Sequence, residues 1–128
     1  MTRQLILTAA FALSTAYADQ AETTDNNNID LMITAAHGNT TQVQTLIAAG
    51  ADINSKGRIG NTALIYAAQE GHTEIVELLI EAGAYADQAN EFNATAKSLA
   101  EGYDYREIAD KLHTATLQAV RETDDNTL

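Results

Sequence analysis

Three histidines are the residues best suited to metal or acid–base chemistry in this 128-residue chain. They are His37, His72 and His113, and the chain has no cysteine. Zinc sites need ligands that meet on one face, such as the two histidines of a His-Glu-x-x-His helix, and no such spacing occurs. Without cysteine there is no thiolate ligand, no thiolate nucleophile and no disulfide. We therefore expect no metal site and no cofactor.

The serines, glycines and carboxylates do not form a catalytic pattern either. Ser14, Ser55 and Ser98 do not stand in a nucleophile elbow. The segment Gly57 to Gly60, GRIG, is too short for a phosphate-binding loop and lacks the Lys-Ser/Thr pair. A pair of carboxyl groups needs a pocket to acquire a raised pKa, and small helices offer little pocket. We predict that the chain is not an enzyme.

The first eighteen residues have the pattern of a secretory signal peptide. Arg3 precedes the apolar run Leu5 to Leu13, and Ala16-Tyr17-Ala18 supplies small residues before Asp19. The apolar run is shorter than the roughly 20 residues that span a bilayer. We expect cleavage after Ala18 and a periplasmic or secreted protein. The alternative is that this segment forms an N-terminal helix of the folded domain.

The remaining chain is strongly acidic. Without Arg3, six basic residues stand against eighteen acidic ones, a net charge of −12. Such a surface repels phosphate backbones and anionic membranes. We expect no nucleic-acid partner and, after signal cleavage, no membrane partner. Residues 19–27, acidic and rich in asparagine, are expected to form a flexible linker.

A repeat with a register of 33 residues follows. Leu31 matches Leu64, and Gly38 matches Gly71. Further matched pairs are Ala35 and Ala68, Val43 and Val76, Leu46 and Leu79, and a weaker third copy pairs Leu79 with Leu112. A fixed period in this range indicates a repeat array whose units bury their apolar faces by stacking.

Each unit has the pattern of two short helices. In the second unit Thr62 is a good N-cap for the first helix, and Gly71 stands where that helix must end with a positive φ. We expect Thr73 to cap the second helix, and Glu81-Ala82-Gly83 to end it. The segments between units, Asp52 to Asn61 and Asp87 to Ala94, are expected to be turns or short hairpins.

The residues from Gly60 to Ala84, GNTALxxAAxxGHxxIVxxLLxxGA, resemble an ankyrin repeat. The resemblance implies an all-α repeat fold, an ankyrin-like helix–turn–helix solenoid of about three units with short hairpin loops. The units would be residues 28–56, 57–89 and 90–116. Residues 117–128 are expected to extend the last helix to about Arg121 and then to form a frayed tail.

Several residues depart from the ankyrin pattern. Ala63 replaces the proline, and Ile65 replaces a histidine that bonds the neighbouring unit. In the third unit Lys97 replaces a leucine, Asn93 the hairpin glycine and Asp104 the helix-ending glycine. His72 stands where the family usually has histidine, so a structural role is expected. Terminal units of a repeat array are generally atypical, because one of their faces meets water.

The resemblance implies a protein-binding face made of loop tips and first helices. Ile59 and Phe92 are equivalent tip residues, and they either seed an interface or fold back over their own loops. Lys56 and Arg58 make the first tip a local positive spot. The expected partner-binding residues are His37, Arg58, Ile59, Asn61, Gln69, Glu70, Glu91, Phe92, Tyr103 and Tyr105.

The expected function is therefore recognition of another protein by a monomeric chain. The resemblance suggests an accessory, inhibitor or immunity protein for an exported enzyme. The alternative is a stabilising or chaperone-like partner that protects a periplasmic enzyme. The two roles differ in their effect on the enzyme, because an inhibitor lowers its activity and a stabilising partner does not.

Overall fold

The structure, a computed structural model, describes residues 26–127, with side chains described as far as Ala119. The expected signal peptide and residues 19–25 of the expected linker lie outside the described residues. Helices follow one another as residues 26–37, α2 (Thr40–Ala48), α3 (Ala63–Glu70), α4 (Thr73–Glu81), α5 (Ala96–Gly102) and α6 (Arg106–Thr127), with a 3-10 turn η1 at Arg58–Gly60. Within these residues the one strand pairing is an isolated bridge between Ala89 and Thr95.

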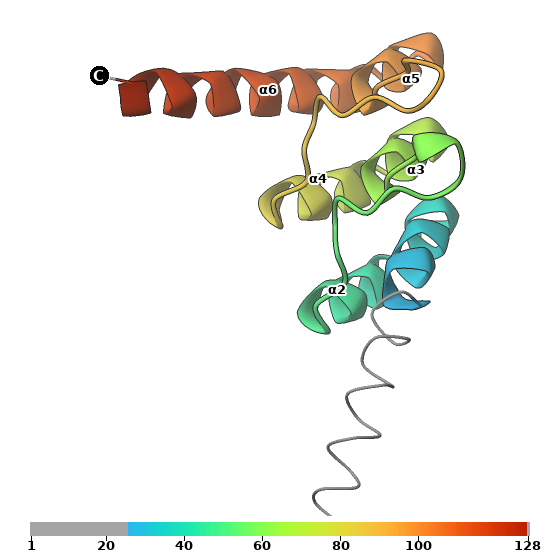
Figure 1. Ribbon diagram of the computed structural model, residues 1–128. Coiled ribbons are helices and arrows are strands. Elements are labelled where there is room, and N and C mark those ends of the chain that lie inside the picture. The colour runs from blue at the N-terminus through green and yellow to red at the C-terminus, as the bar shows by residue number, and fades with distance from the viewer. Residues whose placement is uncertain (1–25, 128) are drawn as a thin grey trace, which may run out of the picture.

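The helices stack in two columns. Figure 1 shows the helix of residues 26–37, α3 and α5 in one column, and α2, α4 and α6 in the other. The chain crosses from the second column to the first through the loops before α3 and before α5. This is the predicted all-α repeat solenoid, with turns in place of extended hairpins.

Equivalent apolar residues of successive units form the core. Leu46, Leu79 and Leu112 are each at most 5% exposed, and they come from α2, α4 and α6. Val43 and Val76 are fully buried beside them. Because α2, α3, α4 and α5 have at most nine residues each, none of these four is stable alone, and packing between units must hold the array together.

A repeated contact joins each helix-ending glycine to the next unit. Gly38 and Gly71 have φ of 82° and 79°, as the sequence predicts for Gly71. A Cβ atom on Gly38 would lie 2.6 Å from the His72 ring, and one on Gly71 would lie 2.8 Å from the Tyr105 ring. His72 and Tyr105 are themselves 33 residues apart, so the same packing recurs. Glycine is required at both positions for conformation and for space.

Asp104 occupies the equivalent position in the third unit and also has a positive φ, of 63°. No further unit follows it within the described residues, so no ring packs over its Cβ. Aspartate tolerates the left-handed region better than most residues. The family's glycine is therefore not needed there for backbone conformation.

The start of α4 corrects the expectation that Thr73 caps this helix. Thr73 does not cap this helix, because it is the first helical residue and His72 holds the cap position without a side-chain hydrogen bond. The His72 ring instead reaches the preceding unit, where Nε2 lies 3.0 Å from the carbonyl oxygen of Ala36. A bond to the neighbouring unit is thus present, although Ile65 cannot make it and is buried in the core.

The last helix is longer than expected. It continues to Thr127, beyond Arg121, where we predicted its end. Gly50 and Gly83 end α2 and α4 in left-handed conformations, whereas Thr116 stands at the equivalent position within α6. Without a glycine to stop it, each further residue adds a helical hydrogen bond, and the helix propagates. Figure 1 shows α6 projecting past the end of α4.

Candidate functional site

Exposed apolar side chains mark the first column and its loops. Five of them come from the helix of residues 26–37, the two loop tips and the C-cap of α5; we call Ile29, Ile33, Ile59, Phe92 and Tyr103 the loop-side strip. Phe92 is 73% exposed and Ile59 is 42% exposed. Both side chains are therefore accessible to a partner protein. Aromatic and aliphatic residues held in water are typical anchors of protein interfaces.

Hydrogen bonds hold the two tips against each other. The backbone N–H of Glu91 donates to the carbonyl of Ile59 at 2.9 Å. The Asn90 side chain donates from Nδ2 to Oδ1 of Asn61 at 2.8 Å. Its own Oδ1 accepts from the N–H groups of Phe92 and Ala94 at 2.9 and 3.0 Å. The tips are therefore fixed relative to each other, which lowers the entropy lost when a partner binds.

Ile59 is held in a strained backbone conformation. Its φ is 54° and its ψ is 21°, in the left-handed region. A β-branched residue is a genuine outlier there, and strain of this kind persists only where neighbouring contacts impose it. The bond from Glu91 to the Ile59 carbonyl is one such contact. The sequence did not predict this conformation.

Two of the expected partner-binding residues are in the wrong place for that role. Asn61 is only 4% exposed, because its side chain is turned inward to accept the bond from Asn90. Tyr105 is partly buried against the core and covers Gly71. It also stacks on Tyr103, with ring centroids 6.0 Å apart, so it supports the strip rather than forming its surface.

The other expected residues are accessible but do not form one cluster. Arg58 and His37 line a shared groove, and Glu91 and Phe92 stand together at the second tip. Glu70 is exposed and Gln69 half-buried, both at the end of α3. Tyr103 is 55% exposed at the C-cap of α5.

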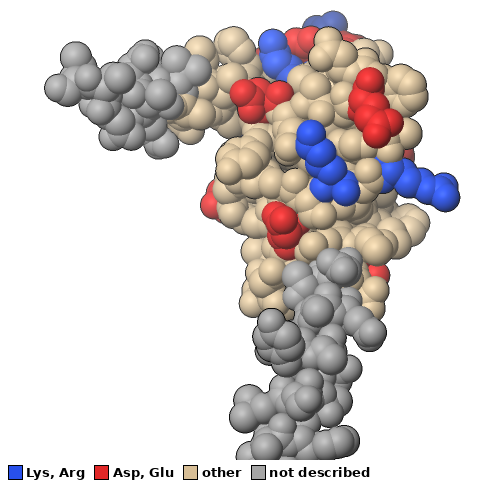
Figure 2. Space-filling model, in the orientation of Figure 1, with Lys and Arg blue, Asp and Glu red and all other residues tan. Residues whose placement is uncertain are grey.

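The groove that Arg58 and His37 share lies between the first helix, the first loop and α3. It has a volume of about 690 Å³, and its lining includes Ile29, Met32, Ile33, Lys56, Arg58 and Tyr66. On the side seen in Figure 2, charged side chains of both signs are scattered over a mostly uncharged surface, and the basic ones form no continuous patch.

Sequence reasoning missed the two isoleucines of this groove. Ile29 and Ile33 are exposed, although the core residues Leu31 and Ala35 on the same helix are buried. For Ile29 a signal was present, since this residue matches the polar Thr62 of the second unit, whereas Ile33 matches Tyr66. An apolar residue without an apolar counterpart in the repeat is not needed for stacking.

Replacing Asn90 by alanine is expected to lower the free energy of unfolding by about 1–3 kcal/mol, because three partners of its side chain lose a hydrogen bond. Asn90→Asp keeps an oxygen that accepts from Phe92 and Ala94 and loses only the bond to Asn61. Urea denaturation should therefore rank the three proteins as parent, Asn90→Asp, Asn90→Ala. Equal stability of parent and Asn90→Ala would contradict the role of Asn90 in fixing the tips.

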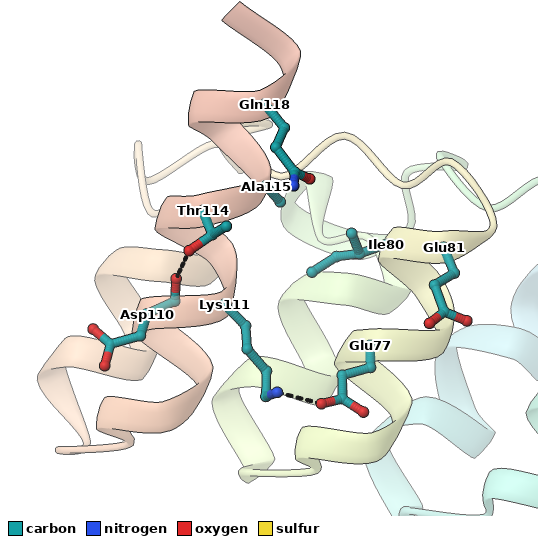
Figure 3. Close-up of a pocket in the computed structure, with 8 residues that line it drawn as sticks. All are labelled: Glu77, Ile80, Glu81, Asp110, Lys111, Thr114, Ala115 and Gln118. Atoms are coloured by element: carbon teal, nitrogen blue, oxygen red, sulfur yellow. Dashed lines mark hydrogen bonds and ion pairs between the residues drawn. The ribbon is translucent and has the colours of Figure 1, made fainter. Parts of the chain in front are cut away.

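A second hollow lies between α4 and α6. Its volume is about 470 Å³, and it is lined by Ile80, Ala115 and Gln118 among others. Figure 3 shows Lys111 of α6 reaching across it to the carboxylate of Glu77. This hydrogen bond, with the nearby charges of Glu77 and Glu107, raises the pKa of Lys111 above 10.5, against the opposing effect of burial. The pair joins the last unit to the middle one.

Lys111→Gln is expected to lower stability slightly at neutral pH, since exposed pairs contribute little. Because the folded-state pKa of Lys111 lies above the unfolded value, this contribution is fully present below pH 10.5 and disappears as pH rises through the folded pKa. Urea denaturation of parent and variant should therefore converge at high pH. Lys97→Gln, which removes a pair within α5, serves as the control. A gap that widened with pH would refute the assignment.

Among the described side chains, no three His, Asp or Glu residues are grouped so that they could hold a metal ion. No helix among the described residues is both long enough and apolar enough to cross a membrane.

Comparison with known families agrees with this geometry. A family model described as ankyrin repeats (3 copies) matches residues 20–122. No curated protein matches the chain. Ankyrin-repeat proteins are generally binding modules without enzymatic activity, and they typically bind other proteins. On the match over most of its length and on its stacked helix pairs, the chain belongs to the ankyrin-repeat family.

Proposed function

We propose that this chain is an exported protein-binding module that restrains a neighbouring enzyme, as an inhibitor or immunity protein. The loop-side strip is the surface through which it binds, and the observation that carries the proposal is the pair of exposed, equivalent tip residues Ile59 and Phe92. Export rests on the signal-peptide pattern of residues 1–18.

Three features of the strip support a binding role. Apolar side chains stand in water at matching positions of successive units, and their loops are held by bonds that pass from one tip to the other. The strain at Ile59 costs about 1–2 kcal/mol of stability, which a surface without function has no reason to retain. The acidic net charge of the chain suits an enzyme with a basic cleft.

The test is affinity capture from an exported fraction with the chain from Asp19 onward. The double variant Ile59→Ser, Phe92→Ser is compared with the parent, and Leu117→Ser is the matched control. Leu117 is 49% exposed on α6, in the other column. We expect one protein to be retained by the parent and by Leu117→Ser and lost with the double variant. Retention by all three would place the interface elsewhere.

An assay of the captured protein decides between the two roles. An inhibitor lowers the activity of its partner when the two are mixed at equal concentration. A stabilising partner leaves the activity unchanged and raises the melting temperature of the enzyme by mass action. The proposal expects the first result, and the second would replace it with the protective role.

A further inference from the structure

We propose that the groove beside the first helix binds an acidic, apolar segment of a partner protein. An aliphatic or aromatic side chain of that segment lies against Ile29 and Ile33, and a carboxylate beside it meets Lys56 and Arg58. This inference rests on the proposed protein-binding function and adds the chemistry of the partner.

The charges around the groove are opposite to those of the chain. Its lining contains Lys56, Arg58 and His37 and no aspartate or glutamate, although the chain has eighteen acidic residues. Among the cationic side chains that the structure describes, Lys97, Arg106 and Lys111 each pair with a carboxylate. Lys56 and Arg58 make no ion pair within that same part of the chain. Because Lys56 and Arg58 lie unpaired beside an apolar groove, they favour binding of a carboxylate from another protein.

The apolar part of the groove has room for a side chain. Ile29 and Ile33 stand one helical turn apart on the same face, and they are 54% and 47% exposed. Met32 lies beneath them, 8% exposed, and packs tightly on Gly57, where an added Cβ would be 2.7 Å from its sulfur. Methionine adapts to varied side-chain shapes. A volume of about 690 Å³ is the size of a site for a short segment.

The charges of the chain argue against two other kinds of acidic ligand, nucleic acids and anionic membranes. Binding to a nucleic acid or an anionic membrane gains its strength from many cations acting together, and a chain of net charge −11 would be repelled. Two cations beside two isoleucines suit a protein segment in which one or two carboxylates flank an apolar side chain. The acidic chain repels such a segment, whereas the cations of this groove attract it, so the charges select where it binds.

Peptide selection tests this chemistry directly. Random peptides of about ten residues, enough to present both an apolar and a charged side chain in one segment, are displayed and selected on the chain from Asp19 onward. The Lys56→Glu, Arg58→Glu variant is screened in parallel. The control, Lys97→Glu, Arg106→Glu, changes the net charge equally outside the groove. We expect the parent and the control to enrich aspartate or glutamate next to Leu, Ile or Phe.

The affinity of one enriched peptide then measures the charge contribution. We expect charge reversal at Lys56 and Arg58 to weaken binding by about tenfold or more, and added salt to weaken binding to the parent. Ile29→Ser, Ile33→Ser should weaken it as well, and the control should not.

Five results would overturn the inference. Peptides without acidic enrichment, or equal affinity for the reversed variant, would refute the partner chemistry while leaving the protein-binding function intact. Failure to select any peptide would do the same if a partner is still captured through Ile59 and Phe92. Peptide binding that appears only after residues 19–25 are deleted would assign the groove to the chain's own acidic segment. A dimer whose formation the peptide competes with would assign it to a second copy.

Discussion

Leu79→Ala is expected to destabilise the array by about 2–5 kcal/mol, the usual cost of a cavity at a fully buried leucine. Leu79 is 0% exposed, in α4 of the middle unit. α4 contacts both α2 and α6, so this residue lies where two unit interfaces meet. Urea denaturation followed by circular dichroism measures the loss. Domains of this size have about 5–15 kcal/mol of stability, so the variant should be close to unfolding at physiological temperature.

The equivalent leucine of the first unit supplies the control. Leu46 is 5% exposed in α2, and among the described helices of the second column α2 contacts only α4. In a repeat array the stability is approximately a sum of unit and interface contributions, so a change that weakens two interfaces costs more than one that weakens a single interface. Leu46→Ala should therefore be less destabilising than Leu79→Ala. An equal or larger loss at Leu46 would contradict the interface model.

The repeat itself was predictable from the sequence because stacking imposes the same residue at the same place in each unit. The 33-residue period predicted the matched leucines of the core, and the residue types at Thr62 and Gly71 predicted a helix cap and a positive φ. All three predictions are confirmed. The length of α6 was not predicted. No glycine stands at Thr116 to end the helix. The prediction extended the helix only as far as its apolar residues continue.

The candidate site was harder to predict, because the repeat pattern fixes backbone positions and not side-chain directions. Asn61 was placed on the surface from its position in the loop, but a bond from Asn90, 29 residues away, turns it inward. Ile29 has no apolar equivalent in the next unit, so the repeat pattern does not count it among the core positions, and it is exposed. The contact between two loops that turns Asn61 inward is not visible in one unit's sequence.

Gly38→Ala is expected to be the second large loss, about 2–5 kcal/mol, since it combines left-handed strain with crowding in a packed contact. Its φ is 82°, and the added Cβ would lie 2.6 Å from the His72 ring. That ring cannot move away freely, because Nε2 is bonded to the carbonyl of Ala36 at 3.0 Å. The measured quantity is again the free energy of unfolding in urea.

Gly50 separates the two contributions to this loss. Its φ is 89°, and a Cβ there would meet nothing within 4 Å. Gly50→Ala should therefore cost only the strain of a left-handed alanine, about 1–2 kcal/mol. If the two alanine variants were equally stable, the contact between Gly38 and His72 would have no energetic role.

Removing the His72 ring tests the contact between Gly38 and His72 from the side of the second unit. His72→Ala alone loses one hydrogen bond and should cost about 0.5–1.5 kcal/mol. In the Gly38→Ala background the same change also removes the clash, so the double variant should be more stable than the sum of the single losses predicts. A double-mutant cycle measures this difference as an interaction energy of about 1–3 kcal/mol. Tyr105 covers Gly71 in the same way, so a similar interaction energy is expected between the second and third units.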